Sequence, residues 1–297
     1  MTLIDIAANL TDPAFQGFYF GKQYHESDID KVLERAAQNG VEKTIVTIGN
    51  VSDLQHALSI VRPHSNLYTT IGVHPLTVSE LENDPQLLEV IDQTCATEPK
   101  IIAFGEIGLD FETERVKMSP KDIQMKWLKE QLKIASKYAY PLFLHSRDAV
   151  PILLDVVAPY IDGTISKLKG VVHSFTGSIA DLELILKTDL YISINGASFR
   201  DATETVARIP IDRILFETDS PYCELKKSYD AYKFVASDAL KTVDRKKYNG
   251  VDLVKGRNEP CNVKYMVEAY AGLTGQNVED VIKQSYRNAV ELYNFNE

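Results

Sequence analysis

The sequence predicts an α/β fold of the (β/α)8 TIM-barrel class, and three observations lead to this prediction. Short β-branched runs alternate with longer amphipathic stretches along the chain, a pattern typical of parallel strands covered by helices. Eight strand candidates fall between Leu3 and Phe216. The length of 297 residues also suits a barrel, which fills roughly 250 residues with one core. These observations favour a barrel over a doubly wound open sheet.

The eight strand candidates are short apolar runs separated by helix-sized segments. They are Leu3–Ala7, Thr44–Ile48, Leu67–Val73, Ile101–Gly105, Leu142–Leu144, Gly170–Val172, Tyr191–Ile194 and Ile214–Phe216. A helix is expected over Ser27–Asn39, with Ser27 as the N-cap and Gly40 just past the end. A second helix is expected to begin at Ser119-Pro120, because proline suits the first helical position.

The composition excludes several classes of protein. With 44% hydrophobic and 25% charged residues, the chain is typical of globular proteins. It has no run of 18 apolar residues that could span a membrane, and its N-terminus lacks the basic region of a secretory signal. Its three cysteines form no CxxC pair, so neither a disulfide framework nor a cysteine zinc site is expected. We therefore expect an intracellular protein, cytoplasmic and, in a eukaryote, also nuclear, with no obligatory protein partner.

Charge is distributed unevenly along the chain. The net charge is −10, but residues 226–257 hold nine Lys or Arg and four Asp, which makes this segment +5 and leaves −15 for the remainder. The segment belongs to a stretch, 223–258, that is too long for an ordinary βα loop. We predict an insertion here, on the C-terminal rim of a single barrel domain spanning 1–297. Its cations alternate with Tyr229, Tyr232, Phe234 and Tyr248, which suits single-stranded nucleic acid and equally an ordinary solvated insertion.

Polar side chains follow most of the predicted strands. In a closed barrel, residues at the carboxyl ends of the strands project into one bowl. A single histidine there is more often structural than a ligand, but imidazoles and carboxylates together favour a centre for Zn²⁺, Mn²⁺ or Mg²⁺. The residues concerned are His74, Glu106, Asp110, His145, Arg147, His173, Glu217 and Asp219.

Four of these segments resemble the signature segments of the TatD family of metal-dependent deoxyribonucleases. They are Gly105-Glu106-Ile-Gly-Leu-Asp110-Phe, Phe-Leu-His145-Ser-Arg147-Asp148, Val-His173-Ser-Phe-Thr-Gly and Phe-Glu217-Thr-Asp219-Ser-Pro-Tyr. Gly72-Val-His74-Pro75 and Gly256-Arg257-Asn258-Glu259-Pro260 fit the same family. The resemblance covers nearly the whole chain. It implies an amidohydrolase-type TIM barrel, hydrolysis of DNA phosphodiesters, and ligation of one or two divalent ions by Glu106, His145, His173 and Asp219.

The first motif departs from the pattern of many family members. They have a His-x-His pair after the first strand, whereas this chain has Asn9-Leu10-Thr11, as in the branch that contains TatD itself. Amide and hydroxyl oxygens are weaker ligands than imidazoles, so a second ion would be loosely held, or Mg²⁺ would enter only with substrate. Asn9 and Thr11 could equally be satisfied loop groups.

These residues suggest a 3′→5′ exonuclease that prefers single strands or frayed ends and uses Mg²⁺ or, alternatively, Mn²⁺ or Zn²⁺. A divalent ion bridged by Glu106 would bind the scissile phosphate and lower the pKa of a water. Asp219 is suited to accept that proton. Glu217 would either orient a histidine, our working interpretation, or contact metal. The candidate substrate contacts are His74, Arg147, Arg257, Asn9, Lys246 and Lys247; for Arg257 a surface salt bridge is the alternative.

Two other functions remain open. An amidohydrolase acting on a small cyclic amide, ester or nucleobase predicts a His-x-His pair and usually a lysine at the end of strand four, where this chain has Glu106. A non-catalytic nucleic-acid-binding or scaffold barrel predicts lost ligands, but all four implied ligands are present.

Overall fold

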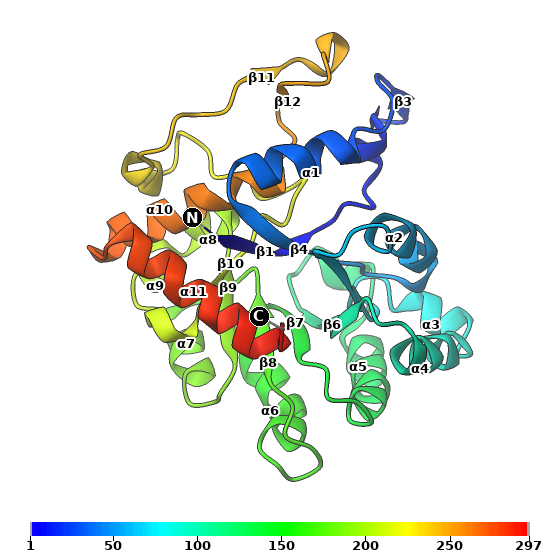
Figure 1. Ribbon diagram of the computed structural model, residues 1–297. Helices are drawn as coiled ribbons and strands as arrows, with labels where there is room; N and C mark the ends of the chain where they lie inside the picture. The colour runs from blue at the N-terminus through cyan, green and yellow to red at the C-terminus, as the bar shows by residue number, and fades with distance from the viewer. Residues whose placement is uncertain (1, 296–297) are drawn as a thin grey trace. The chain divides into compact units, whose positions relative to one another are not determined.

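The computed structural model describes residues 2–295, and its main sheet has eight strands. In sheet order they are β1 (Leu3–Ala8), β4 (Val41–Val46), β5 (Leu67–Ile71), β6 (Ile101–Asp110), β7 (Leu142–Arg147), β8 (Gly170–His173), β9 (Tyr191–Ile194) and β10 (Ile214–Phe216). The pairs β1–β4, β5–β6, β6–β7, β7–β8 and β8–β9 are parallel. A parallel bridge from Ala8 to Ser220 connects the ends of β1 and β10. This topology confirms the predicted (β/α)8 class (Figure 1).

Helices follow most of the strands. The α-helices are α1 (Ile29–Gln38), α2 (Leu54–Val61), α3 (Ser79–Asn83), α4 (Leu87–Thr97), α5 (Lys121–Ala135), α6 (Val150–Ile161), α7 (Ile179–Ile185), α8 (Gly196–Asp201), α9 (Thr203–Val206), α10 (Val263–Thr274) and α11 (Val278–Tyr293). Short 3-10 helices are η1 (Pro13–Gln16), η2 (Val51–Asp53), η3 (Arg115–Lys117), η4 (Ile211–Arg213) and η7 (Pro260–Asn262). Within residues 2–295, no helix combines the length and the apolar composition needed to cross a membrane.

The chain divides into two compact units. The first comprises the residues up to Val46 together with Ile194–Ala289, and the second comprises Thr47–Ser193 together with the segment from Val290. In the first unit, α10 packs on β1 and β10; in the second, α2, α5 and α6 pack on β5, β6 and β7. Every residue of β1, β8 and β9 is buried, as expected for a parallel sheet with both faces covered.

Four strands continue further than the sequence predicted: β1 and β8 by one residue each, β7 by three and β6 by five. β6 runs to Asp110 and β7 to Arg147, so Glu106 and His145 lie within strands and not after them. Glycines in β6 allow this extension. A Cβ on Gly105 would lie 2.3 Å from the Phe143 carbonyl oxygen, and one on Gly108 would lie 2.0 Å from that of His145. The backbone of β6 can therefore lie against β7 up to its last residue.

The predicted starts of two helices were wrong by one or two residues. Asp28, not Ser27, is the N-cap of α1, and the Ser27 hydroxyl donates instead to the Phe15 carbonyl oxygen (3.3 Å). Asp28 has no capping hydrogen bond because its carboxylate contacts arginine side chains. Pro120 is the N-cap of α5 and not its first helical residue.

The segment 223–258 contains little regular structure. Its elements are η5 (Asp230–Phe234), β11 (Thr242–Val243), η6 (Arg245–Lys247) and β12 (Leu253–Val254), and β11 pairs in parallel with β12. A hairpin near the N-terminus, β2 (Phe18–Tyr19) with β3 (Lys22–Gln23), was not predicted. Both features lie in the first unit.

Candidate metal centre

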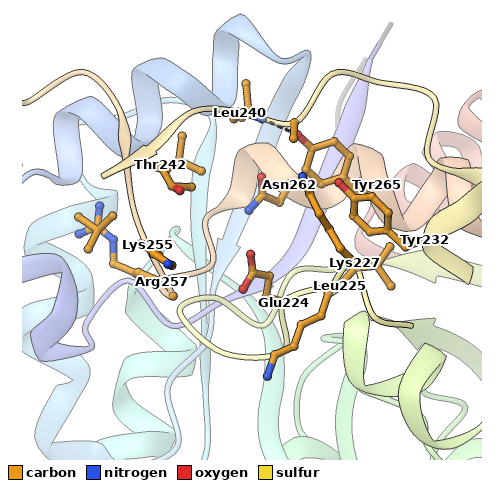
Figure 2. Close-up of a pocket in the computed structure, with 15 residues that line it drawn as sticks. Glu224, Leu225, Lys227, Tyr232, Leu240, Thr242, Lys255, Arg257, Asn262 and Tyr265 are labelled. Carbon is orange, nitrogen blue, oxygen red and sulfur yellow. Dashed lines mark hydrogen bonds between the residues drawn. The ribbon is translucent and has the colours of Figure 1, made fainter. Parts of the chain in front are cut away.

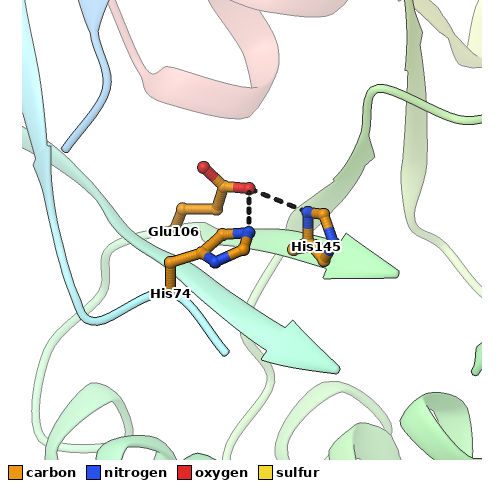
Figure 3. A group of neighbouring side chains, drawn as sticks. All are labelled: His74, Glu106 and His145. Carbon is orange, nitrogen blue, oxygen red and sulfur yellow. Dashed lines mark hydrogen bonds and ion pairs between the residues drawn. The ribbon is translucent and has the colours of Figure 1, made fainter. Parts of the chain in front are cut away.

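Three histidine rings surround one carboxylate oxygen, Glu106 Oε1. It lies 3.3 Å from His74 Nε2, 2.9 Å from His145 Nδ1 and 2.6 Å from His173 Nε2. Figure 3 shows His74 and His145 directed at this oxygen from two sides. All four side chains belong to the second unit. The arrangement brings together three of the four ligands implied by the family resemblance and adds His74, which the sequence analysis had assigned to substrate.

Neighbouring strands set these positions. His145 in β7 is in register with Gly108 of β6 and with His173, the last residue of β8. His74 lies three residues beyond β5, where its backbone N–H donates to the Gly49 carbonyl oxygen (2.9 Å) and its Nδ1 accepts from the backbone N–H of Leu76 (3.1 Å). The other ring nitrogen of His74, Nε2, faces Glu106 Oε1.

Asp110 supports the group from the end of β6. Its Oδ2 lies 3.1 Å from His145 Nε2 and 2.9 Å from Arg115 Nη1. The imidazole of His145 is thus held between two carboxylates, those of Glu106 and Asp110. Sequence reasoning gave Asp110 no role of its own, although its place after a predicted strand was the signal that could have identified it.

The pKa values of His74, Glu106 and Asp110 shift in the direction that metal binding requires, because ligands bind in their deprotonated forms. His145 differs: burial lowers its pKa, but its hydrogen bonds with Asp110 and Glu106 outweigh burial and raise the pKa above the ordinary value. Burial lowers the pKa of His74 to about 3, so its imidazole is neutral. Burial opposes ionisation of Glu106, but the adjacent His173 and His74 and the hydrogen bond from His145 hold its pKa well below the ordinary value. Burial would also raise the pKa of Asp110, yet the hydrogen bond with His145 and the contact with Arg115 lower it to about 2. Glu106 and Asp110 are therefore carboxylates.

The donor set fits a divalent metal ion. Ligand atoms of His74, Glu106 and His145 all lie within 4.8 Å of one another, as donors around a common centre must. Imidazole nitrogens with one or two carboxylate oxygens are accepted by Zn²⁺ and Mn²⁺, while Mg²⁺ prefers oxygen. Arg147, two residues beyond His145, ends β7 and is half-buried.

Besides Glu217, the first unit contains another predicted catalytic carboxylate, Asp219. Its backbone N–H donates to the Ala7 carbonyl oxygen (2.8 Å), its Oδ1 accepts from Asn9 Nδ2 (2.8 Å), and its Oδ2 accepts from Cys223 Sγ (3.3 Å). Asn9 also contacts the Ser220 carbonyl oxygen through both its backbone N–H (2.7 Å) and its side chain (3.2 Å). The amide that stands in place of a His-x-His pair therefore contacts the Asp219 carboxylate. Cys223 was not predicted to take part.

Glu217 lies at the end of β10 and is fully buried. Its Oε1 accepts a hydrogen bond from Asn195 Nδ2 (3.0 Å), and its backbone N–H donates to the Ile194 carbonyl oxygen (3.2 Å). Thr218 is tied to β1 by Asp5, whose Oδ1 accepts from the Thr218 backbone N–H (2.9 Å). These contacts fix the segment that presents Asp219. Asn195 follows a predicted strand in the same pattern as the other polar residues, a signal that sequence reasoning missed.

Arg257 forms salt bridges that are buried, not on the surface. Its guanidinium donates to both Asp28 oxygens (2.7 and 2.6 Å) and to Glu259 Oε1 (2.8 Å), and it lies over the Phe15 ring at 4.9 Å. Arg35 completes the cluster through bonds to Glu259 (2.8 and 3.1 Å) and Asp28 (3.3 Å). Both terminal nitrogens of Arg257 therefore donate to protein groups, and only 3% of the residue's surface is exposed.

Within the insertion, the lysines predicted to contact substrate are exposed to solvent, whereas Tyr248 and Phe234 contact other parts of the protein. Lys246 and Lys247 are exposed on η6. The Tyr248 hydroxyl donates to Asp28 Oδ2 (2.6 Å), and Phe234 packs against α10, where a Cβ on Gly272 would lie 2.4 Å from its own Cβ. Tyr232 lines a pocket of about 340 Å³ with Lys227, Lys255 and Tyr265 (Figure 2). None of the histidines around Glu106 lines this pocket.

Comparison with known proteins identifies close relatives across the chain. A family model described as TatD related DNase matches residues 4–294. The chain is 35% identical to a Schizosaccharomyces pombe protein named Deoxyribonuclease Tat-D, over 97% of this chain and 94% of the relative. It is 30% identical to an Erwinia amylovora protein named 3'-5' ssDNA/RNA exonuclease TatD, over 98% and 99%.

A solved structure agrees with this relationship. A hydrolase TatD family protein from Entamoeba histolytica superimposes with a TM-score of 0.91 at 33% identity, covering 99% of this chain and 98% of the other. Because the superposition covers 99% of this chain, the segments that contain the clustered histidines lie almost entirely within it.

Proposed function

Because this chain belongs to the TatD-related DNase family, we propose that it is a divalent-metal-dependent 3′→5′ exonuclease acting on single-stranded or frayed DNA. The observation that carries the proposal is the convergence of three imidazoles on one oxygen of Glu106. The name of the Erwinia relative, a 3'-5' ssDNA/RNA exonuclease, supports the polarity and the strand preference.

His74, Glu106, His145 and His173 would hold the ion, and we propose Asp219 as a further ligand. A bound divalent ion supplies positive charge for the scissile phosphate and lowers the pKa of a water. Mg²⁺ remains our prediction for the native ion. Since the set is rich in nitrogen, Mn²⁺ and Zn²⁺ must be tested beside it.

Asp219 is the proposed proton acceptor. Hydrogen bonds from Asn9 and Cys223 reach its two oxygens and orient the carboxylate, and a carboxylate held in one orientation is suited to accept a proton from water. Glu217 acts in this proposal through the backbone, because its bonds to Asn195 and Ile194 hold the segment that precedes Asp219. Asn9 is accordingly a positioning residue.

Arg147 and the insertion are the proposed contacts with the DNA strand. Arg147 would offset charge on phosphate oxygens, and the exposed Lys246 and Lys247 would follow the backbone by charge alone. The three cysteines are free thiols, which is consistent with a reducing compartment. We therefore also infer an intracellular location.

The test is a digest of oligonucleotides labelled at the 3′ or the 5′ end, with Mg²⁺, Mn²⁺ or Zn²⁺ and with an EDTA control. Stepwise shortening from the 3′ end of a single strand, abolished by EDTA, is expected. A matched RNA substrate separates DNA from RNA preference, and a dihydropyrimidine substrate tests the amidohydrolase alternative. Equal activity with EDTA, or turnover of the cyclic amide alone, would contradict the proposal.

A further inference from the structure

Phe20, at the tip of the β2–β3 hairpin, is the most exposed large hydrophobic side chain of the residues described. It is 92% exposed, and Phe18 in the same hairpin is 41% exposed. The hairpin has a two-residue loop, Phe20-Gly21, because Phe18 pairs with Gln23 and Tyr19 with Lys22.

Both loop residues have positive φ, 52° for Phe20 and 75° for Gly21. Asn or Asp usually occupies the first position of such a loop, because positive φ strains a bulky side chain. Phenylalanine thus occupies this position against local preference and without burial.

A cation from the insertion lies over the hairpin. The Arg245 guanidinium is 5.0 Å from the Phe20 ring centroid, 5.3 Å from that of Tyr19 and 5.5 Å from that of Tyr24. The Lys22 ammonium also lies over Tyr24, at 5.5 Å. Residues 20 and 245 are far apart in sequence but belong to the same unit. We call the group formed by Tyr19, Phe20, Lys22, Tyr24 and Arg245 the hairpin platform.

The base of the platform is firmly attached to the protein. The Tyr24 backbone N–H donates to the Gly17 carbonyl oxygen (2.9 Å), and the His25 ring packs against the Tyr248 ring in a tilted arrangement, with centroids 4.4 Å apart. Tyr248 in turn donates to Asp28 in the buried arginine cluster. Phe20 is therefore an exposed ring on an ordered support, so a ligand that stacks on it need not order the hairpin first.

The charge around the platform favours an anionic ligand. Residues 18–26 and 244–247 together contain four cationic side chains and two acidic ones. The cations are Lys22, Arg245, Lys246 and Lys247, and the acids are Glu26 and Asp244. The Asp244 carboxylate accepts a hydrogen bond from the Lys246 backbone N–H (2.9 Å). This bond involves the main chain of Lys246 and not its ammonium group. Exposed aromatic faces flanked by cations are the means by which proteins bind unpaired bases and their phosphates.

We propose that the hairpin platform binds an unpaired nucleobase of a single-stranded nucleic acid, which stacks on the Phe20 ring while Lys22 and the η6 cations contact flanking phosphates. This inference rests on the proposed function for its choice of ligand, and it moves the stacking role from the tyrosines of the insertion to a residue outside it. Unpaired bases of DNA and of RNA share this chemistry, so both are used as probes.

The test measures binding without turnover. Fluorescent dodecamers of thymidylate, of uridylate and of an abasic deoxyribose phosphate chain are titrated in EDTA with the full-length protein. Stacking on an aromatic side chain is worth about 1–3 kcal/mol per base, so Phe20→Ser should weaken binding of the base-containing probes about 5- to 150-fold. The abasic probe should bind the variant and the wild type equally.

Three further variants separate stacking from hydrophobicity and from surface change. Phe20→Leu should lose as much affinity as Phe20→Ser, whereas Phe20→Trp should keep it. Trp127 is the one native tryptophan and is buried, so the added emission of Phe20→Trp reports on the platform and should be quenched by bases but not by the abasic chain. Ile165→Ser, which alters another exposed apolar side chain, is the control and should bind as the wild type does.

The outcomes distinguish this inference from the proposed function. The proposed role of the hairpin platform is contradicted if Phe20→Ser binds the base-containing probes with wild-type affinity, or if it loses affinity for the abasic probe to the same extent. Either result holds even if the enzyme degrades DNA normally. Base-dependent binding through Phe20 supports it even if no nuclease activity is found.

Discussion

His145 and His173 offer the most direct test of the metal centre at the scale of single residues. Both touch Glu106 Oε1, so His145→Ala and His173→Ala should each remove a ligand and abolish nuclease activity. Residues at the carboxyl ends of barrel strands contribute little to the core, and circular dichroism should therefore remain that of the folded protein. His64→Ala, in the loop before β5 and outside the centre, is the matched control. Normal turnover in either purified variant would exclude the proposed centre.

Asp219 and Glu106 should respond differently to amide substitution. Asp219→Asn can still present an oxygen to a metal but cannot accept a proton. We expect metal and DNA binding within a few-fold of wild type and turnover lowered by roughly 10²-fold or more. Glu106→Gln loses the negative charge on which three imidazoles converge, and it should lose metal as well as activity. Calorimetric metal titration of both variants decides the matter: if Asp219→Asn loses metal to the same extent, Asp219 is only a ligand.

The sequence predicted which residues belong to the candidate site more reliably than it predicted which residues they contact. Glu106, His145 and His173 were found because each is a polar residue directly after an apolar run, and their side chains do converge. The contact of Asn9 with Asp219 spans 210 positions, a pairing that no local pattern specifies. Arg257 is similar: its motif was visible, but its carboxylate partner Asp28 is 229 residues away.

At the scale of elements, strand interiors were predicted better than element ends. All eight strands of the main sheet were located, because buried β-branched runs mark them strongly. The extension of β6 to Asp110 depends on the closeness of β7 to Gly105 and Gly108, which is tertiary information. The start of α1 was misplaced for a related reason, since Asp28 binds arginines and does not form a capping bond.

The η6 turn provides a second test at this scale. Lys246→Glu with Lys247→Glu reverses two exposed charges and should raise the KM for DNA. It should also make the salt dependence of binding shallower, by about 0.7 in the log–log slope for each phosphate that the protein no longer neutralises. Turnover of a small chromogenic phosphodiester should stay unchanged. Lys129→Glu with Lys187→Glu, an equal charge change on exposed residues of the other unit, should leave the KM as it is. Unchanged DNA affinity in the η6 variant would mean that these lysines are ordinary solvated surface.

At the scale of the molecule, the buried arginine cluster connects segments near the two ends of the chain. Arg257→Met should destabilise the fold by on the order of 3–5 kcal/mol, because it leaves the carboxylates of Asp28 and Glu259 buried with fewer partners. Chemical denaturation measures this loss. Arg200→Met, which removes an exposed pair with Asp201, should cost about 1 kcal/mol or less. Equal stability of the two variants would show that the Arg257 cluster contributes no more than a surface pair.

The same cluster sets an order of events during synthesis of the protein. Arg35 and Glu259 are 224 residues apart, so their salt bridge must wait until most of the chain has left the ribosome. At about 5–20 residues per second, that delay is about 11–45 s. Throughout it, Arg35 in α1 lacks the Glu259 carboxylate and has only Asp28 of the two acidic partners, while Thr47–Ser193 emerges as one uninterrupted segment. A nascent chain halted before residue 257 would therefore expose the N-terminal segments to proteases and chaperones, and completion of the Gly256–Pro260 motif would end that exposure.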